Sequence, residues 1–186
     1  SGTDGPASAC VSALGWVPHH GTPPGRDRAT AGEVLLLTGA VGGSRAARHR
    51  DPVARLAAGR QLRLAGASAM MDVSDGLALD AGRIAERSRV AIELERDRVP
   101  IHADAVAASS ASGRTPLEHA LTDGEDHELL ACLTADRARE VLAAGLADCP
   151  DACLVGRVRA GSGLSLVDPG GHQVPLPERL GWLHGS

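Results

Sequence analysis

Along the sequence, short apolar runs alternate with segments whose apolar residues recur at helical spacing. Val90, Ile92 and Leu94 alternate with Ala91 and two glutamates, which predicts a half-buried strand. From Leu77 onward, apolar residues recur every three or four positions, which predicts a helix. By the same patterns we expect further strands at 10–17, 33–38, 68–73, 128–133, 152–158, 164–167 and 173–175, and further helices at 52–65, 103–110, 114–121 and 135–145. Strands and helices that alternate in this way are typical of an α/β or α+β domain with helices packed on a sheet.

The first of these helices has clear predicted ends. Asp51 is expected to cap it and Pro52 to occupy its first position, because aspartate and proline favour those places. Val53 and Leu56 begin its apolar face, and Gly66 marks its end.

The composition is that of one domain, or of a domain with an extra strand or two. The chain has 186 residues, of which 43% are hydrophobic and only 1% aromatic. Its core is therefore built from alanine, leucine and valine, and the two tryptophans, Trp16 and Trp182, stand out. All 19 basic residues are arginine.

The charge pattern excludes several classes of partner. The net charge is −4, the pI is near 6.0, and no long basic or acidic run occurs, so we expect binding neither to nucleic acid nor to an anionic membrane. No apolar stretch reaches transmembrane length and no signal peptide is visible. We expect a cytoplasmic protein, and the opening Ser1 without a methionine suggests a trimmed or processed chain.

The four cysteines are expected to be free thiols. Cys149 and Cys153 are spaced as C-x3-C, but no second pair of ligands supplies a zinc site. Cys132 lies in an apolar run and is expected to be buried, and Cys10 stands alone. Whether Cys149 and Cys153 ever pair stays open at this point.

The most informative polar segment is Asp72 to Leu77. Asp72, Ser74 and Asp75 fall at a strand-to-helix junction, where free N–H groups at a helix start suit phosphate. Two carboxylates beside a phosphate make sense if Mg²⁺ lies between them, because Mg²⁺ takes few carboxylates plus phosphate oxygens and water. The alternative is that Ser74 or Asp75 merely caps the helix. Capping does not explain Asp72, at the end of an apolar run.

A second acidic segment lies at 122–128, between a predicted helix and a buried strand. It contains Asp123, Glu125, Asp126 and Glu128. Like charges this close require solvent, backbone N–H groups, a cation or a cationic substrate. The alternative to a binding site is an exposed acidic turn.

Two other polar features are expected to be structural. The glycine-rich run at 39–44 follows a predicted strand but lacks the residues of a P-loop or a dinucleotide fingerprint, so it is interpreted as a turn. His19, His20 and His127 lack metal-ligand spacing, so they are interpreted as surface histidines.

Together, the two acidic segments resemble the thiamine-monophosphate kinase family. Residues 71–77 (MDVSDGL) are similar to its Asp-x-Ser-Asp-Gly-Leu motif, and 121–130 (LTDGEDHELL) to its later Ser-Gly-Gly-Glu-Asp-Tyr-Glu-Leu motif. Residues 11–15, 33–39 and 181–182 also match, so the resemblance extends over essentially the whole chain. It departs from the family where Asp123 replaces a glycine and His127 a tyrosine.

The resemblance implies a mixed sheet with packed helices and transfer of the γ-phosphoryl group of ATP to thiamine monophosphate, which gives thiamine diphosphate and ADP. Asp72 and Asp75 would bind Mg²⁺, the implied cofactor, and Ser74 the nucleotide. No residue is expected to act as a catalytic acid or base, because phosphoryl transfer needs positioning and charge neutralisation above all.

Further binding residues follow from the same resemblance. Arg26 lies where the family places an arginine that contacts ATP, with Arg28 as a rival. Glu125 or Asp126 would contact the substrate, and Trp182 would stack on a ring of thiamine monophosphate, where a cationic thiazolium suits an aromatic face.

The resemblance also divides the chain. Residues 1–18 would be the last strand segment of a missing amino-terminal ATP-binding domain, and 19–186 the carboxy-terminal domain. The missing half would carry further Mg²⁺ ligands and the interface of a homodimer, so we expect this chain alone to be inactive. Two alternatives stay open: another ATP-using synthetase or kinase of the same superfamily, or a non-catalytic binding domain.

Overall fold

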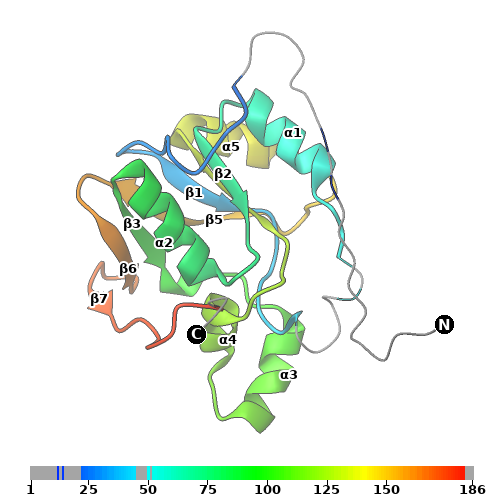
Figure 1. Ribbon diagram of the computed structural model, residues 1–186, viewed down its shortest axis with the longest axis vertical. Coiled ribbons are helices and arrows are strands. Elements are labelled where there is room, and N and C mark those ends of the chain that lie inside the picture. Colours follow the sequence, from blue (N-terminus) through cyan, green and yellow to red (C-terminus); the bar gives the residue numbers. More distant parts are fainter. Residues whose placement is uncertain (1–11, 13, 15–21, 45–49, 51, 183–186) are drawn as a thin grey trace, which may run out of the picture.

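The computed structural model describes residues 12, 14, 22–44, 50 and 52–182 of the chain (Figure 1). The strands are β1 (Val34–Leu37), β2 (Ala69–Asp72), β3 (Ala91–Glu95), β4 (Leu129–Leu133), β5 (Cys153–Arg159), β6 (Gly163–Val167) and β7 (Gln173–Val174). The helices are α1 (Leu56–Leu64), α2 (Leu77–Ser88), the 3-10 turn η3 (Arg96–Arg98), α3 (Ala103–Ser112), α4 (Pro116–Thr122) and α5 (Ala135–Ala144).

The described strands form one seven-stranded sheet in the order β2-β4-β1-β5-β3-β6-β7. β3 and β6 are parallel, whereas every other neighbouring pair is antiparallel. The strands expected at 164–167 and 173–175 are present as β6 and β7, which form an antiparallel pair. The predicted class, a mixed sheet with helices packed on it, is therefore confirmed.

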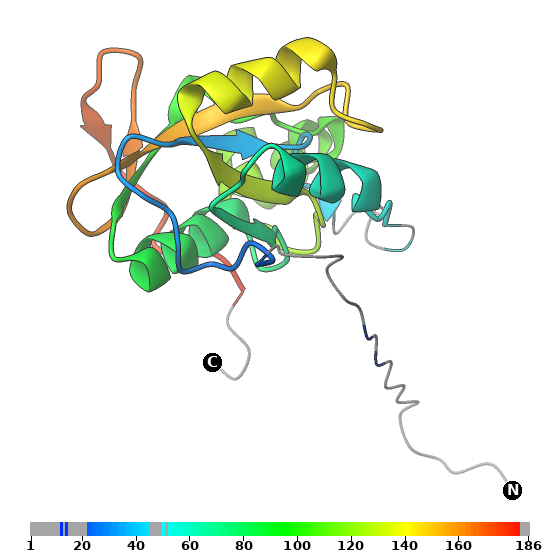
Figure 2. The same cartoon turned by 90° about the horizontal axis from the view of Figure 1, so that it is seen from above.

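Helices cover both faces of the sheet (Figures 1 and 2). On one face, α2 and α4 bury Leu77, Ile84 and Leu121 in the larger core cluster. On the other, α1 and α5 bury Leu62 and Ala138 in a second cluster. β1 contributes to both clusters, because successive residues of a strand face opposite sides. None of the described helices is both long and apolar enough to cross a membrane.

The first helix is the element whose predicted start was wrong. α1 begins at Leu56 rather than at Pro52, and Asp51 lies outside the described residues. Val53 and Leu56, expected to begin its apolar face, are 62% and 80% exposed. The residue before the helix is Arg55, whose guanidinium binds acceptors from other elements. Arg55 is thus the N-cap of α1, and residues 52–54 lie before the helix.

Some predictions fall largely outside the described residues. The strand expected at 10–17 is one of them: only Ser12 and Leu14 are described there, and neither is in a strand. Trp16, His19 and His20 also lie outside the described part of the chain.

The cysteines that the structure describes, Cys132, Cys149 and Cys153, are free thiols, as expected. Burial, helped by the negative charge of Glu33, raises the pKa of Cys132 to about 12. This thiol is therefore protonated and unreactive at neutral pH. Cys10 lies outside the described residues.

Candidate functional site

The pairing of β2 with β4 brings the two acidic segments of the sequence together. Asp72, the last residue of β2, lies opposite Leu129, the first residue of β4. The contact continues past the strand ends, since the Glu125 N–H donates to the Ser74 carbonyl at 2.7 Å. A Cβ atom added at Gly124 would lie 2.5 Å from that carbonyl oxygen. Two motifs far apart in the sequence therefore adjoin at one end of the sheet.

Asp80 holds the junction between β2 and α2. Its Oδ2 accepts the N–H groups of Ser74 and Asp75, each at 3.0 Å, and Arg83 donates to both Asp80 and Asp75. The N-cap of α2 is Gly76, with φ of 123°, a conformation that favours glycine. The interpretation of Ser74 or Asp75 as the helix cap is therefore wrong. The backbone N–H groups of Ser74 and Asp75 are bonded to Asp80 and are not open to phosphate, whereas the helix itself begins two residues later, at Leu77.

The carboxyl group of Asp80 is fully buried. Burial raises its pKa above the usual value, although the two junction N–H groups and the Arg83 charge favour its ionised form. Asp80 and Arg83 together orient Asp75, the former through its backbone and the latter through its side chain. Sequence reasoning missed both residues. The available signal was an acidic residue on the apolar face of a predicted helix, which needs a partner when it is buried.

In the second segment, Asp126 and Glu128 are buried and bonded within the protein. The Gly42 N–H donates to both oxygens of Asp126, at 3.0 and 2.8 Å. Arg55 donates to Glu128 at 2.9 and 2.7 Å, and the Thr38 hydroxyl donates to it at 2.6 Å. The alternative of an exposed acidic turn is wrong for both residues, since each is under 5% exposed.

Asp123 is also buried, and it joins three elements. It accepts the Gly43 N–H at 3.2 Å and a hydrogen bond from Arg114 at 3.0 Å, and it lies 2.8 Å from Nδ1 of His119. The other ring nitrogen of His119 lies 2.7 Å from the Ser112 hydroxyl. Asp123 thus ties the glycine turn to the α3–α4 hairpin.

The glycine-rich run at 39–44 is a structural turn, as predicted. Gly42 and Gly43 have φ of 90° and 77°, and a Cβ atom on either would collide with the backbone of α4 or α3. Only glycine allows this approach together with these angles. The turn therefore presents its N–H groups to the protein's own carboxylates, Asp123 and Asp126.

A pocket of about 1010 Å³ opens beside the two acidic segments. It is lined by Ser74, Asp75, Arg114, Glu118, Thr122, Asp123, Gly124, Glu125, His127, Leu176, Pro177, Glu178, Arg179, Gly181 and Trp182. Four of the predicted site residues, Ser74, Asp75, Glu125 and Trp182, therefore meet here. Of the pair Glu125 and Asp126, only Glu125 lines the pocket. The volume is at the upper end of that usual for small-molecule sites.

The carboxy-terminal segment reaches the pocket through contacts with the start of α2. The Trp182 N–H donates to the Asp75 carbonyl at 2.8 Å, and the Leu79 N–H donates to the Leu180 carbonyl at 3.1 Å. A Cβ atom at Gly181 would collide with the Asp75 carbonyl oxygen. These contacts hold Trp182, which is 57% exposed, at the pocket edge.

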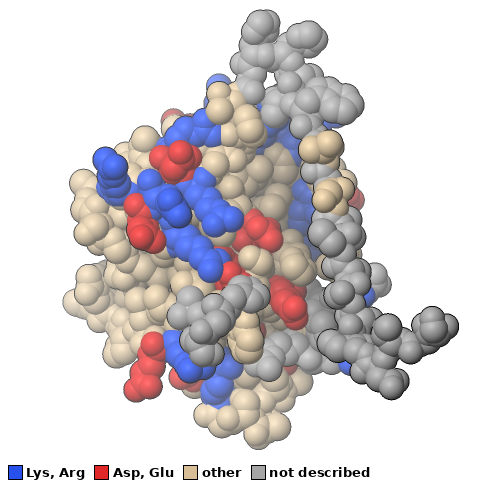
Figure 3. All heavy atoms as spheres, viewed as in Figure 1, with Lys and Arg blue, Asp and Glu red and all other residues tan. Residues whose placement is uncertain are grey.

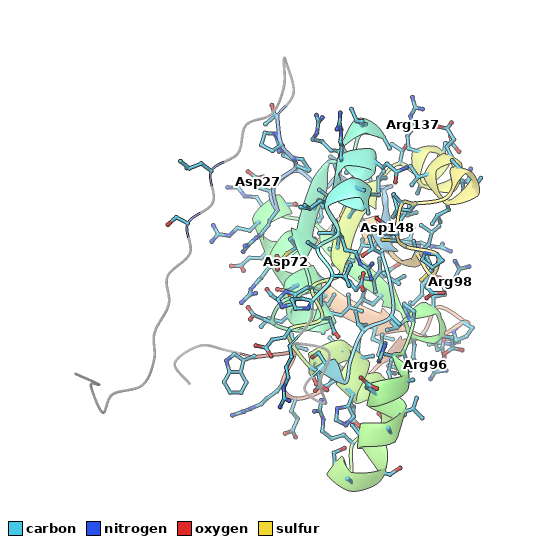
Figure 4. All side chains as sticks on the ribbon, turned by 90° about the vertical axis from the view of Figure 1, so that its right-hand side faces the viewer. Asp27, Asp72, Arg96, Arg98, Arg137 and Asp148 are labelled. Atoms are coloured by element: carbon cyan, nitrogen blue, oxygen red, sulfur yellow. The ribbon has the colours of Figure 1, made fainter. Side chains whose placement is uncertain are left out.

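Asp72 and Arg26 lie apart from the pocket lining. The Asp72 side chain is 51% exposed and 4.0 Å from Nδ1 of His127 (Figure 4). Arg26 is exposed, and its carbonyl accepts the Ser88 hydroxyl at 2.9 Å. Its rival Arg28 is also exposed and donates to the Pro23 carbonyl. The structure thus places neither arginine in the pocket wall.

The described residues contain no group of three or more His, Cys, Asp or Glu side chains arranged to hold a metal ion. Asp72 and Asp75 still suit Mg²⁺, because Mg²⁺ is usually held by one or two carboxylates while phosphates and water supply the other ligands. Asp72 is half exposed, whereas Asp75 is 14% exposed and pairs with Arg83. The two aspartates therefore fit Mg²⁺ only as a partial site, which a phosphate ligand would complete. On the face that carries α2, arginines lie among further acidic side chains (Figure 3).

Comparison with known proteins identifies the family. The model of the AIR synthase related protein, C-terminal domain, matches residues 38–169. The chain belongs to this family. It is 42% identical over 136 residues to a thiamine-monophosphate kinase of Rhodopirellula baltica, covering 73% of this chain and 42% of the relative. It is 32% identical over 180 residues to that of Aquifex aeolicus, covering 86% and 54%. The chain spans about half the length of these relatives, which confirm the resemblance to thiamine-monophosphate kinases.

Solved structures agree with this family. AaThiL complexed with AMPPCP and TMP matches with a TM-score of 0.69 and 31% identity, over 87% of this chain and 54% of that one. E. coli HypE, a hydrogenase maturation protein, matches with a TM-score of 0.66 at 22% identity, over 87% and 54%. The second likeness shows the fold alone.

Proposed function

We propose that this chain supplies the carboxy-terminal half of a site that transfers the γ-phosphoryl group of ATP to thiamine monophosphate. The observation that carries the proposal is the pocket, which joins Ser74 and Asp75 from one motif, Glu125 from the other and Trp182 from the end of the described chain. The similar proteins named thiamine-monophosphate kinase, and the related structure with AMPPCP and TMP, support this choice of nucleotide and acceptor.

At the phosphate end of the site, Asp72 and Asp75 would hold Mg²⁺, which when bound offsets the charge of the phosphate groups. Asp80 and Arg83 keep Asp75 in one orientation. Ser74 would contact the nucleotide from the pocket wall. In-line transfer with no phospho-enzyme needs only such positioning and charge neutralisation. Arg26 stays a predicted ATP contact outside the pocket.

At the acceptor end, Trp182 offers an exposed aromatic face and Glu125 an exposed carboxylate. Both suit a cationic thiazolium, the first through its ring and the second through its charge. Asp126 faces Gly42 instead, so we assign the acceptor contact to Glu125. The amino-terminal half and the homodimer that it would form remain predictions.

Binding to this chain tests the acceptor end. Titration with thiamine monophosphate should change tryptophan fluorescence, and the change should be lost in Trp182→Ala, which leaves Trp16 as the only tryptophan. Trp182→Ala should unfold at the same urea concentration as the wild type, because its side chain is largely exposed. No saturable binding by the wild type would contradict the proposal.

Turnover tests the phosphate end in a protein that contains both halves. Asp75→Ala and Asp72→Ala should each reduce ADP release by about 100-fold or more, because each removes a charge that acts on the reacting phosphates. Wild-type rates in both variants would exclude these carboxylates from the mechanism. This chain alone should release no ADP, and normal turnover by it would refute the division into halves.

A further inference from the structure

The ionisable side chains that line the pocket are mostly acidic. They include the carboxylates Asp75, Glu118, Asp123, Glu125 and Glu178, and the guanidinium groups of Arg114 and Arg179. A ligand that carries a phosphate meets repulsion from such a lining. Besides the Mg²⁺ that Asp72 and Asp75 would hold, the lining offers the guanidinium groups of Arg114 and Arg179 as fixed positive charges for an anionic acceptor.

Arg114 is held in place by three acceptors. Its Nη1 donates to Asp123 at 3.0 Å, and its Nη2 donates to the Glu118 carbonyl at 3.0 Å and to the Thr122 hydroxyl. A guanidinium group has five N–H donors, so within the described residues its Nε hydrogen and one Nη1 hydrogen remain for a ligand. The side chain is 37% exposed and lines the pocket.

The contact with Thr122 also places the Arg114 guanidinium close to the phosphate end of the site. A Cβ atom at Gly76 would lie 3.1 Å from Cα of Thr122, so the end of α4 packs on the residue that follows Asp75. Arg114 thus lies on the α4 side of the junction, while Arg83 pairs with Asp75 from α2.

Arg179 lacks comparable support. In the described part of the chain, no hydrogen bond or ion pair holds its guanidinium, whereas Arg114 has three. A side chain already fixed in its binding geometry loses less conformational entropy when it binds. A planar guanidinium is also suited to bidentate recognition of phosphate.

We propose that Arg114 recognises the phosphate group of the acceptor and that Asp123 positions Arg114 for this contact. This rests on the proposed function and adds to it the residue that selects a phosphorylated acceptor over the free alcohol. Arg114 is a specificity-determining residue, and Asp123, which is 5% exposed, acts through it.

Titration of this chain with thiamine monophosphate and with thiamine, both without Mg²⁺, tests the inference. In Arg114→Gln the affinity for thiamine monophosphate should fall about 10- to 100-fold, as expected for lost hydrogen bonds between charged groups. The affinity for thiamine should stay unchanged, because thiamine has no phosphate. Asp123→Asn should give a smaller loss of the same selectivity. Arg137→Gln, which removes the same charge from the exposed face of α5 (Figure 4), is the matched control.

The outcomes separate this inference from the proposed function. Suppose that the wild type binds thiamine monophosphate, and that Arg114→Gln lowers the affinity for both ligands equally or for neither. The inference is then wrong and the proposed function stands. If the wild type binds neither ligand, the inference is wrong, and the proposed function is wrong as well if thiamine monophosphate also fails to bind in the presence of Mg²⁺. Should Arg114→Gln fail to fold, Arg114→Lys keeps the charge and loses the planar fork, and an intermediate loss confined to thiamine monophosphate is expected. An unchanged preference in Arg114→Lys would then contradict the inference.

Discussion

The two acidic segments have similar compositions but different surroundings. At the β2–α2 junction, the Asp72 carboxylate is half exposed and Asp75 lines the pocket. In the segment 123–128, Asp126 and Glu128 are buried against the Gly42 N–H and the Arg55 guanidinium. The first segment keeps one carboxylate half exposed, that of Asp72, although Asp75 pairs with Arg83, whereas most charge in the second segment is offset within the protein.

The comparison teaches that the number of carboxylates in a motif does not locate a ligand site. What matters is whether the groups that offset the negative charge belong to the same chain. In the second segment, the glycine turn and Arg55 provide them, and Glu125 alone is exposed. Glu125 has φ of 65° and His127 of 55°. Such angles turn the backbone on either side of Asp126, so that Asp126 points inward and its neighbour outward.

The largest effect that separates the segments should come from Glu128→Ala. This change leaves Arg55, which is 17% exposed, without its carboxylate, and should lower the free energy of unfolding by about 3 kcal/mol or more. Glu125→Ala, the matched change on an exposed neighbour, should stay within about 0.5 kcal/mol of the wild type. Urea denaturation measures both. Equal midpoints for the two variants would contradict the assignment of Glu128 to the core.

Asp126→Ala should have the next largest effect on the free energy of unfolding. It leaves the buried Gly42 N–H without its acceptor, at a cost of about 1–3 kcal/mol, while the affinity for thiamine monophosphate is retained. Glu125→Gln should do the opposite, with roughly fivefold weaker binding and no loss of stability. Denaturation and calorimetric titration of the same two preparations would test this. A loss of affinity in Asp126→Ala without a loss of stability would show that Asp126 contacts the ligand.

A smaller effect is expected from Gly181→Ala. The added methyl group collides with the Asp75 carbonyl, so it should displace the Trp182 segment and cost about 1 kcal/mol. Gly171→Ala serves as a control: no atom lies within 4 Å of the added Cβ, although its φ of 81° is positive, unlike that of Gly181. Thermal unfolding measures the loss of stability. The fluorescence titration should show weakened ligand binding in Gly181→Ala alone. Equal ligand binding in both variants would contradict the role of the contact with the Asp75 carbonyl in holding Trp182.

The smallest effect is a change of stability with pH that depends on Asp80. Because burial raises its folded pKa above the usual 3.8, its contribution to stability is fully present below that value and is lost as pH rises through the folded pKa. The free energy of unfolding of the wild type should therefore fall relative to that of Asp80→Asn as pH rises from 3.8. A relative rise over that range would show that the N–H groups and Arg83 outweigh burial.

Much of the fold could be predicted because its elements have strong local patterns. The alternation at 90–94 and the repeat from Leu77 predicted β3 and α2, and both are present. The start of α1 was predicted four residues too early, and the local pattern did not show that Arg55, its N-cap, bonds to Glu128 and Asp148, which are distant in the sequence.

The site shows the same limit. Of the residues that the resemblance assigned to the site, Ser74, Asp75, Glu125 and Trp182 line one pocket. Asp72, Arg26 and Asp126 do not. No motif predicted Asp80 or Arg114, because their roles arise from tertiary contacts: one bonds the junction backbone, and the other bridges α4 to Asp123. The inward direction of Asp126 likewise depends on the glycine turn, which lies more than eighty positions earlier.

Asp75 contributes to the pocket in two ways, since its carboxylate pairs with Arg83 while its carbonyl holds the Trp182 N–H. The charged end and the segment that carries the aromatic end of the cavity thus both contact a single residue. A shift of this residue would therefore move both ends of the cavity at once.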